Sequence, residues 1–424
     1  MKVLVIGGGG REHALAWKAA QSPQVDTVFV APGNAGTALE PKLENVNVSG
    51  NEALVQFARD NGVALTIVGP EAPLVDGVVD AFQAADLAIF GPTAAAAQLE
   101  GSKAFSKDFL ARHDIPTAQY RTFSEVAPAL AYLDERGAPI VVKADGLAAG
   151  KGVIVAMTLA EAKEAVEDML SGNAFGDAGA RVVIEDFLEG EEASFIVMVD
   201  GDHVLSMATS QDHKRVGDGD TGPNTGGMGA YSPAPVVTSA IHDRIMREVI
   251  LPTVAGMKAD GTPYTGFLYA GLMIDASGAP KVIEFNCRFG DPETQPIMMR
   301  LQSDLVALCQ AAVEGRLNEV SADWDSRAAV GVVMAAENYP ASPKKGDAIS
   351  GLDAVPADVK VFHAGTREQD GQVVTSGGRV LCVTALGDTV SAAQQLAYQG
   401  VKAINWDGAF YRSDIAYRAI AREQ

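Results

Sequence analysis

The sequence predicts a multidomain protein of the α/β and α+β classes: an N-terminal parallel α/β domain, a central body with a mobile lid, and a small β-rich C-terminal domain. Short apolar runs alternate with helical stretches up to about residue 100, the pattern becomes mixed from Gly101, and β-rich segments follow Asp325. A chain of 424 residues has room for about three domains of ordinary size. We place their boundaries at 1–100, 101–325 and 326–424, with the lid at about 117–190.

The N-terminal domain repeats one pattern of an apolar run, a Gly- or Pro-containing loop and a helical stretch. The apolar runs are 3–6, 27–30, 65–68 and 87–90. Short β-branched runs that alternate with helices predict a parallel sheet with right-handed crossovers. Ligands of such sheets bind at the carboxyl ends of the strands, where the loops GGGGREH, APGNAG, GPEAP and GPT fall. We therefore expect this domain to bind a ligand.

The central part predicts helices and short strands in mixed order. A helix is expected over SKAFSKDFLARHD, and a later one begins with a capping box formed by Thr158 and Glu161. The expected strands are 140–143, 153–156, 182–185, 193–199, 203–209, 267–274 and 281–285. A long polar loop is expected at 211–233, a helix at 239–257, and one helix whose buried stripe runs from Ile297 to Ala312. Strands at 329–335 and 379–386 indicate the third domain.

The composition limits the kinds of partner. A net charge of -21 argues against nucleic-acid binding, which depends on clustered Lys and Arg. Cys287, Cys309 and Cys382 lack paired spacing, which indicates a reducing compartment and neither a disulfide framework nor a zinc site. The first apolar run is too short for a signal peptide or a membrane span. We expect a cytoplasmic, monomeric protein without nucleic-acid or membrane partners.

The strand at 281–285 carries the most informative polar residues. Strand side chains alternate between faces, so Glu284, Asn286 and, if the strand continues, Arg288 share one face, while Ile283 and Phe285 face a core. A carboxylate and an amide oxygen suit a phosphate-bound Mg²⁺, and an arginine can grip a carboxylate or phosphate. A solvated edge strand would carry the same residues, so the pattern alone leaves both readings open.

Two glycine-rich loops indicate phosphate binding. In the first, the third glycine of a dinucleotide fingerprint would fall at Glu12, so a phosphosugar site with Arg11 fits better than a nicotinamide site. The second, 143–152, is no Walker A loop, because Gly152 stands where Ser or Thr would hold Mg²⁺. It can fold as a flap over a triphosphate that Lys143 neutralises. Tight turns without ligand would also explain both loops.

The polar segment at 211–229 packs acidic, basic and glycine residues together. Ordered loops of this length are uncommon without a functional reason, although disorder is the alternative. His213 could act as a general base, but a loop histidine is more often a hydrogen-bonding bystander.

Six segments together resemble one enzyme family. They are GGGGREHAL, PGNAG, VGPE, KADGLAAGKGV, QDHKR with DGDTGPNTGGMGAYSP, and RFGDPETQ. In this order they resemble the glycinamide ribonucleotide synthetase family, the phosphoribosylamine-glycine ligases of the ATP-grasp superfamily, over essentially the whole chain. The last two segments are highly specific, whereas one glycine turn alone is a weak signal.

The resemblance implies an ATP-dependent ligase of de novo purine synthesis that uses Mg²⁺ or Mn²⁺. Glycine would accept the γ-phosphoryl group of ATP, and glycyl phosphate would react with 5-phosphoribosylamine to give glycinamide ribonucleotide, ADP and phosphate. Such catalysis is mainly positioning and charge neutralisation.

The resemblance also implies residue roles. The ATP-binding residues would be Lys103, Lys143, Gly150, Gly152, Glu185, Phe187, Leu188 and, at the ribose, Glu191. Glu284 and Asn286 would bind the metal. The catalytic residues would be Lys143, Asp212, Lys214 and Arg288, of which Arg288 holds the glycine carboxylate. The other substrate-binding residues would be Gly8, Gly9, Gly10, Arg11, Asn34, Gly36, Pro70, Glu71 and Asp220.

One departure from the superfamily concerns the metal. Many members carry a further acid on the preceding strand, but 269–274 has none, so a ligand from Asp212 or Asp220 stays open. The sequence leaves three alternatives to the resemblance: another ATP-grasp ligase of purine synthesis, a nicotinamide-dependent dehydrogenase and a non-catalytic nucleotide-binding regulator. The first should lack QDHKR and RFGDPE, the second needs an acidic ribose ligand, and the third should lose Glu284, Asn286 or Lys143.

Overall fold

The computed structural model describes residues 1–148, 152–171 and 175–424. Its N-terminal part is a five-stranded sheet of order β3-β2-β1-β4-β5, and every neighbouring pair is parallel. The strands are β1 (Lys2–Gly7), β2 (Thr27–Pro32), β3 (Leu43–Asn45), β4 (Val63–Val68) and β5 (Ile89–Phe90). The predicted parallel sheet is confirmed, with the short β3 as an addition.

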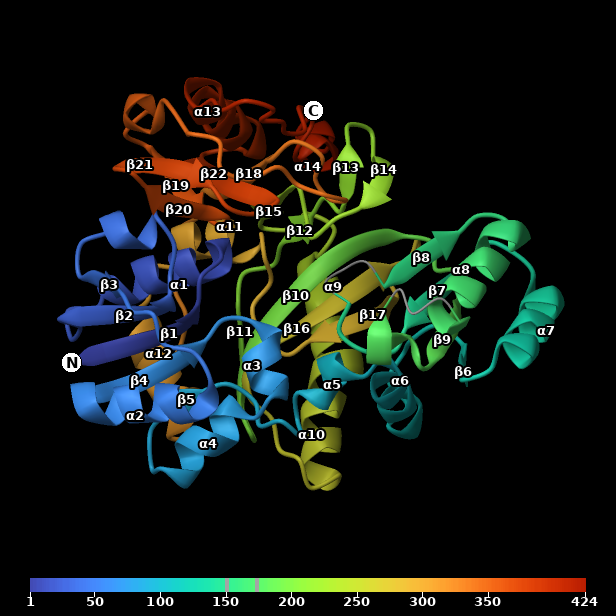
Figure 1. Cartoon of the computed structure of the whole chain (residues 1–424). Helices are drawn as coiled ribbons and strands as arrows, with labels where there is room; N and C mark the ends of the chain where they lie inside the picture. The colour runs from blue at the N-terminus through green and yellow to red at the C-terminus, as the bar shows by residue number, and fades with distance from the viewer. Residues whose placement is uncertain (149–151, 172–174) are drawn as a thin grey trace.

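Helices cover both faces of this sheet, as expected for parallel strands. Helix α1 (Gly10–Ala20) packs on one face, and α2 (Asn51–Asn61) and α4 (Val78–Ala84) pack on the other. Helix α3 (Glu71–Val75) follows β4, and α5 (Gln98–Gly101) and α6 (Lys103–Arg112) follow β5 and contact the body at Pro280–Asn286. Both cores continue into the next sheet, so the N-terminal part and the body form one packed unit (Figure 1).

The body is an antiparallel sheet of order β11-β10-β16-β17. Its strands are β10 (Glu191–Asp200), β11 (Val204–Ser206), β16 (Thr265–Ile274) and β17 (Pro280–Asn286). The predicted helix at 239–257 is confirmed as α9 (Ser239–Ile245) and α10 (Leu251–Ala259), joined by a π-helical stretch at Met246–Ile250.

The predicted single helix from 297 to 312 is wrong, because the helix is interrupted at residues 301–304, between α11 (Thr294–Arg300) and α12 (Leu305–Val313). Leu301 adopts extended backbone, and the Asp304 side chain accepts hydrogen bonds from the N–H groups of Val306 and Ala307, which begins a new helix. The apolar stripe stays buried across the break.

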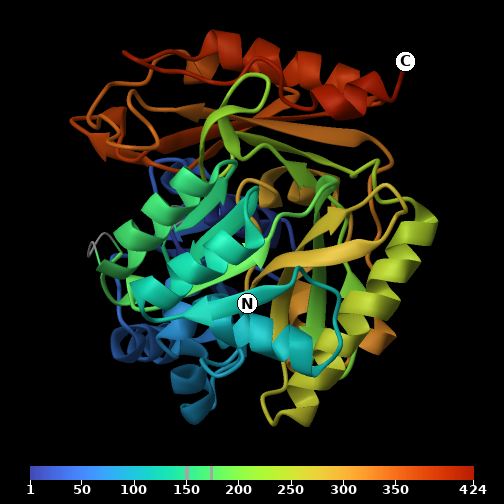
Figure 2. The ribbon, with the colours of Figure 1, turned by 90° about the vertical axis from the view of Figure 1, so that its right-hand side faces the viewer.

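The lid is a separate four-stranded antiparallel sheet of order β6-β9-β7-β8. It contains β6 (Tyr120–Phe123), β7 (Ile140–Ala144), β8 (Val153–Ala156), β9 (Val182–Asp186), α7 (Val126–Arg136) and α8 (Leu159–Ser171). Thr158 and Glu161 form the predicted capping box. The lid buries its own apolar cluster against its two helices, and it lies beside the body in Figures 1 and 2.

The C-terminal sheet has the order β12-β15-β18-β22-β19 and so takes strands from two distant parts of the chain. The predicted polar loop at 211–233 is wrong, since it holds β12 (Gln211–Asp212), β13 (Arg215–Gly217), β14 (Thr221–Asn224) and β15 (Gly229–Ser232). The remaining elements are β18 (Ala328–Ala335), β19 (Val359–His363), β20 (Thr366–Gln369), β21 (Gln372–Thr375), β22 (Arg379–Gly387), α13 (Val390–Ala403) and α14 (Tyr417–Ala421). Backbone pairing of β15 with β18 anchors the polar segment.

Candidate active site

A cavity of about 450 Å³ lies where the lid, the body, the polar segment and the C-terminal sheet meet. The lid strands line it with apolar side chains, among them Val141, Val155 and Val183. The facing side is polar and charged. Its lining residues include Asp212, Lys214, Glu284, Asn286, Arg288 and Glu293. One wall therefore suits a flat apolar group and the other suits charged groups.

Glu185 on β9 joins the lid to the body through two lysines. Its carboxylate is buried and ion-paired with both Lys143 on β7 and Lys107 on α6. Although burial opposes ionisation, these two ammonium groups lower the pKa of Glu185. Burial lowers the pKa of Lys107 to about 8 even though Glu185 acts against it. Lys143 Nζ also donates to the Ile283 carbonyl at 3.0 Å, which connects the lid with β17.

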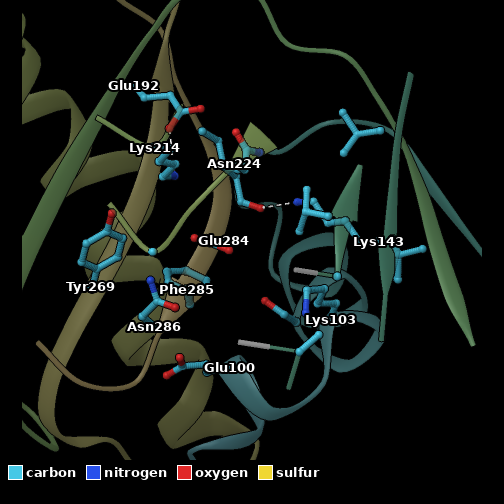
Figure 3. A pocket seen from close by; sticks show the side chains of 18 of the residues that line it. Glu100, Lys103, Lys143, Glu192, Lys214, Asn224, Tyr269, Glu284, Phe285 and Asn286 are labelled. Atoms are coloured by element: carbon cyan, nitrogen blue, oxygen red, sulfur yellow. Dashed lines mark hydrogen bonds and ion pairs between the residues drawn. The ribbon is translucent and has the colours of Figure 1, made fainter. Parts of the chain in front are cut away.

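The end of β17 presents the predicted metal-binding pair. Glu284 pairs with Gly271 of β16, Asn286 pairs with Tyr269, and a bulge falls between them and the start of the strand. Figure 3 shows Glu284 and Asn286 facing Lys103 and Lys143 across the cavity.

The predicted core position of Phe285 is confirmed, but that of Ile283 is wrong, because Ile283 is half-buried and lines the cavity. The bulge breaks the strict alternation of faces at this point.

Three lysines control the charge of Glu284. Burial would raise its pKa, but Lys214, Lys143 and Lys103 together lower it. Lys103 itself donates to the Gly146 carbonyl at 3.0 Å and so stays close to the flap. The Glu284 carboxylate is therefore kept ionised in a cationic part of the cavity.

The pair suits a nucleotide-bound Mg²⁺. The described ranges hold no cluster of three or more His, Cys, Asp or Glu side chains that could bind a metal alone. A Mg²⁺ on a polyphosphate needs only one or two protein carboxylates. Glu284 makes no ion pair with a described cation, and Asn286 adds an amide oxygen whose described hydrogen bond, from Arg288, is long at 3.4 Å, so both residues could serve as ligands.

Arg288 lies beyond the end of β17 and still lines the cavity. Its guanidinium pairs with Glu100 at 2.9 Å and Glu71 at 3.2 Å, and donates to Asn286 Oδ1 at 3.4 Å. Burial would lower its pKa, but Glu100 and Glu71 raise it, so Arg288 is a fixed cation. Glu71 and Glu100 thus orient the side chain predicted to hold a carboxylate.

The polar segment contributes Asp212 and Lys214 to the same cavity. Lys214 Nζ pairs with Glu192 at 2.9 Å. A dashed line marks this ion pair in Figure 3. Glu191, predicted at the ribose, is held by Arg422 at 2.6 Å and by Gln211 at 2.8 Å, and the cavity is lined by Glu192 in its place. Successive strand residues face opposite sides of a sheet, so Glu192 lines the cavity whereas Glu191 faces away from it.

Asp220 and His213 lie away from the cavity, in the contact between the polar segment and α14. Asp220 pairs with Arg412 at 3.0 Å and with Arg418 at 2.7 Å. His213 Nε2 accepts a hydrogen bond from the Ala416 N–H at 2.9 Å. Both residues therefore hold the polar segment against α14 and the residues just before it.

The predicted phosphosugar residues separate into two groups. Arg11 and Glu71 line the cavity. The following predicted residues are absent from the described lining: Gly8, Gly9, Gly10, Asn34, Gly36 and Pro70. Asn34 donates to the carbonyl groups of Gly8 and His363 and accepts from the Gly36 N–H, so it ties these loops to the C-terminal sheet.

Of the predicted nucleotide residues, Lys103, Lys143, Gly152, Glu185, Phe187 and Leu188 line the cavity, whereas Gly150 lies outside the described residues. Several lining residues were missed: Glu100, Lys107, Glu192, Asp291, Glu293 and Arg379. The RFGDPE motif already contained Asp291 and Glu293. Arg379 comes from β22, and no local pattern in the sequence connects it to this site.

Comparison with known proteins identifies relatives over the whole chain. Models of the phosphoribosylglycinamide synthetase family match its N domain at 1–100, its ATP-grasp (A) domain at 101–294 and its C domain at 329–418. The phosphoribosylamine–glycine ligases of Vibrio parahaemolyticus and Escherichia coli O6:H1 are each 72% identical and are covered completely, as is this chain.

Solved structures agree. The phosphoribosylamine–glycine ligase of Thermotoga maritima superposes with a TM-score of 0.86 at 33% identity, covering 98% of this chain and 100% of that one. Biotin carboxylase of Campylobacter jejuni gives a TM-score of 0.73 at 13% identity over 98% of both chains, and so shares the fold. None of the described helices combines the length and apolarity needed to cross a membrane.

Proposed function

Because this chain belongs to the phosphoribosylglycinamide synthetase family of ATP-grasp enzymes, we propose that its cavity joins glycine to 5-phosphoribosylamine with conversion of ATP to ADP and phosphate. The observation that carries the proposal is the cavity itself, in which Glu284 and Asn286 face Lys103 and Lys143 beside the apolar lid. Such a constellation positions a nucleotide and neutralises its phosphates.

The nucleotide would lie between the lid and the body. Its base would fit the apolar wall near Phe187 and Leu188, with the backbone after β9 reading its edge. Its phosphates would lie near Lys103 and Lys143. The resemblance places Glu191 at the ribose, but Glu192 lines the cavity and so has the better position for contact with the nucleotide.

Glu284 and Asn286 would hold Mg²⁺ or Mn²⁺, which when bound neutralises phosphate charge. A glycine carboxylate oxygen attacks the γ-phosphorus and ADP leaves, which forms glycyl phosphate. The amine of phosphoribosylamine then attacks the carbonyl carbon, phosphate leaves, and the nitrogen loses a proton. Arg288, fixed by Glu71 and Glu100, would orient the glycine carboxylate. Lys143 and Lys214 would stabilise charge on the transferred group.

The sugar phosphate would bind toward Arg11 and Glu71, with Gly8, Gly9, Gly10, Asn34, Gly36 and Pro70 shaping that end of the site. The boundaries 1–100, 101–325 and 326–424, a monomeric state and a cytoplasmic location are further parts of the proposal. Asp220, predicted to bind substrate, fits better as a link to α14.

The test is ADP release by purified protein with Mg²⁺-ATP, phosphoribosylamine and one small acid at a time. We expect turnover with glycine and none when glycine or phosphoribosylamine is left out. Turnover with another acid and no dependence on glycine would assign the chain to another ligase reaction of the ATP-grasp superfamily. ATP binding without any turnover would favour a regulator.

A further inference from the structure

Glu293 is a cavity carboxylate that neither nucleotide nor metal binding explains. It immediately precedes α11, within the RFGDPE motif, and the residue is only 2% exposed. It lines the cavity, yet its Oε2 atom has no hydrogen-bond partner in the described part of the chain. A buried polar atom without a partner costs free energy, so such an atom in a binding cavity indicates a missing ligand group.

Asp212 is a second carboxylate of the same cavity and lies on β12. Within the described ranges, neither Asp212 nor Glu293 forms an ion pair with Lys, Arg or His. Other cavity carboxylates do: Glu71 and Glu100 pair with Arg288, Glu185 with Lys107 and Lys143, Glu192 with Lys214, and Asp291 with Arg379. The exception, Glu284, is the proposed metal ligand.

The two carboxylates are close enough to affect each other. Burial and then the Asp212 charge raise the pKa of Glu293 to about 8. Burial likewise raises the pKa of Asp212, although Lys214 opposes this. The fixed guanidinium of Arg288 interacts electrostatically with Glu293 as well. The site therefore places the Arg288 guanidinium in the same cavity as two carboxyl groups that form no ion pair within the described residues.

We propose that Glu293 and Asp212 bind the ammonium group of glycine while Arg288 binds its carboxylate. The proposal rests on the proposed function and adds to it the subsite that distinguishes an amino acid from a simple carboxylic acid. An ammonium group has three N–H donors, which suits two carboxylates, and it would supply the partner that Glu293 Oε2 lacks.

Two carboxylates would keep the glycine nitrogen protonated and so prevent it from acting as a nucleophile. A protonated amine has no lone pair and cannot attack an acyl phosphate. The amine of phosphoribosylamine would then be the nucleophile presented to glycyl phosphate in the cavity. Two carboxylates around the glycine nitrogen would therefore favour amide formation with the correct partner.

The test uses Glu293→Gln and Asp212→Asn in the full-length chain, since both keep side-chain shape and remove charge. Loss of one partner from a desolvated ion pair costs at least about 30-fold in affinity. We expect the KM for glycine to rise at least about 30-fold and the KM for ATP to change less than about threefold. Selectivity for glycine over glycolate, which lacks the ammonium group, should fall by a similar factor.

One control variant and two further measurements separate this role from others. Glu319→Gln removes a carboxylate outside the cavity and should leave all constants unchanged. Calorimetry of glycine binding with a non-hydrolysable ATP analogue should detect binding to the wild type and none to Glu293→Gln. Thermal unfolding should show that the variant is folded.

Three results would overturn the inference. They are an unchanged glycine KM in both variants, unchanged selectivity against glycolate, and loss of one bound Mn²⁺ in paramagnetic resonance, which would make the carboxylates metal ligands. If the wild type binds glycine with this dependence on Glu293 but does not join it to phosphoribosylamine, the proposed function fails while the ammonium subsite stands.

Discussion

At the residue scale, Glu284 is the side chain whose charge we expect to matter most for the proposed phosphoryl transfer. Three lysines keep it ionised, and no described cation forms an ion pair with it. Glu284→Gln keeps the shape and removes the charge, so we expect kcat to fall by about 100-fold or more, as for other groups that stabilise transition-state charge. Steady-state ADP release with saturating glycine measures this, with Glu319→Gln as the control. An unchanged kcat would exclude Glu284 as a ligand of the proposed metal.

A substitution of Glu185 tests how much the buried ion pairs between lid and body stabilise the fold. Removing one partner of a buried ion pair leaves a charge without compensation and costs about 3–5 kcal/mol. Glu185→Gln would leave both Lys107 and Lys143 in that state, so we expect a loss of this size in the free energy of unfolding. Chemical denaturation followed by circular dichroism measures it. The double variant with Lys107→Met should recover part of the loss, and additive losses would show that the two side chains do not interact.

At the element scale, apolar periodicity predicted most long strands and helices but missed elements that depend on distant partners. The residues of β12 and β15 are mostly polar or small, and these strands exist because β15 pairs with β18 about 100 residues later. The break between α11 and α12 did leave a local signal, since Asp304 before an apolar run is a helix N-cap pattern. In the first case the polar composition predicted a loop, although pairing with a distant strand makes the segment a strand. In the second case the continuous apolar stripe predicted one helix, although Asp304 begins a new one.

A substitution at Gly152, between β7 and β8, tests the proposed nucleotide site. A Cβ atom on Gly152 would lie 2.6 Å from the Ala148 Cβ and 3.3 Å from the Ala144 Cβ, so any larger residue must displace Ala148. We expect Gly152→Val to raise the KM for ATP about tenfold, because overpacking costs about 1–3 kcal/mol. Initial rates at varied ATP concentration measure this. Ile154→Ala alters a more exposed side chain of the same hairpin and should keep the wild-type KM.

At the scale of the whole molecule, the site combines residues that no sequence window brings together. Arg379 of β22 donates to the carbonyl groups of Gly226 and Asp291, at 2.9 and 2.7 Å. The C-terminal sheet thereby supports both the polar segment and the RFGDPE turn. The motifs predicted which chemical groups line the cavity. They did not predict the contribution of the C-terminal sheet, because it depends on tertiary contacts that leave no hydrophobic periodicity in the sequence.

The same sheet meets the N-terminal part through two buried histidines. The backbone N–H of His363 donates to His13 Nδ1 at 2.8 Å, and His13 Nε2 contacts the Glu40 carboxylate at 2.9 Å. Burial lowers the pKa of His363 to about 3, and burial likewise lowers that of His13. Below the ordinary histidine pKa of about 6.5, the unfolded chain binds protons that the folded chain does not, so stability must fall as the pH falls.

This contact predicts how acid destabilises the molecule. Between pH 7 and pH 5, His363 alone accounts for about 2 kcal/mol of lost stability, because its folded form stays neutral over that range. His363→Gln removes this proton uptake, so the difference in unfolding free energy between the two pH values should shrink by about that amount. Denaturant titrations at both pH values measure it. His203→Asn, at a more exposed histidine, should leave the difference as in the wild type, and equal pH dependence in all three proteins would show that the buried histidine pair does not control acid stability.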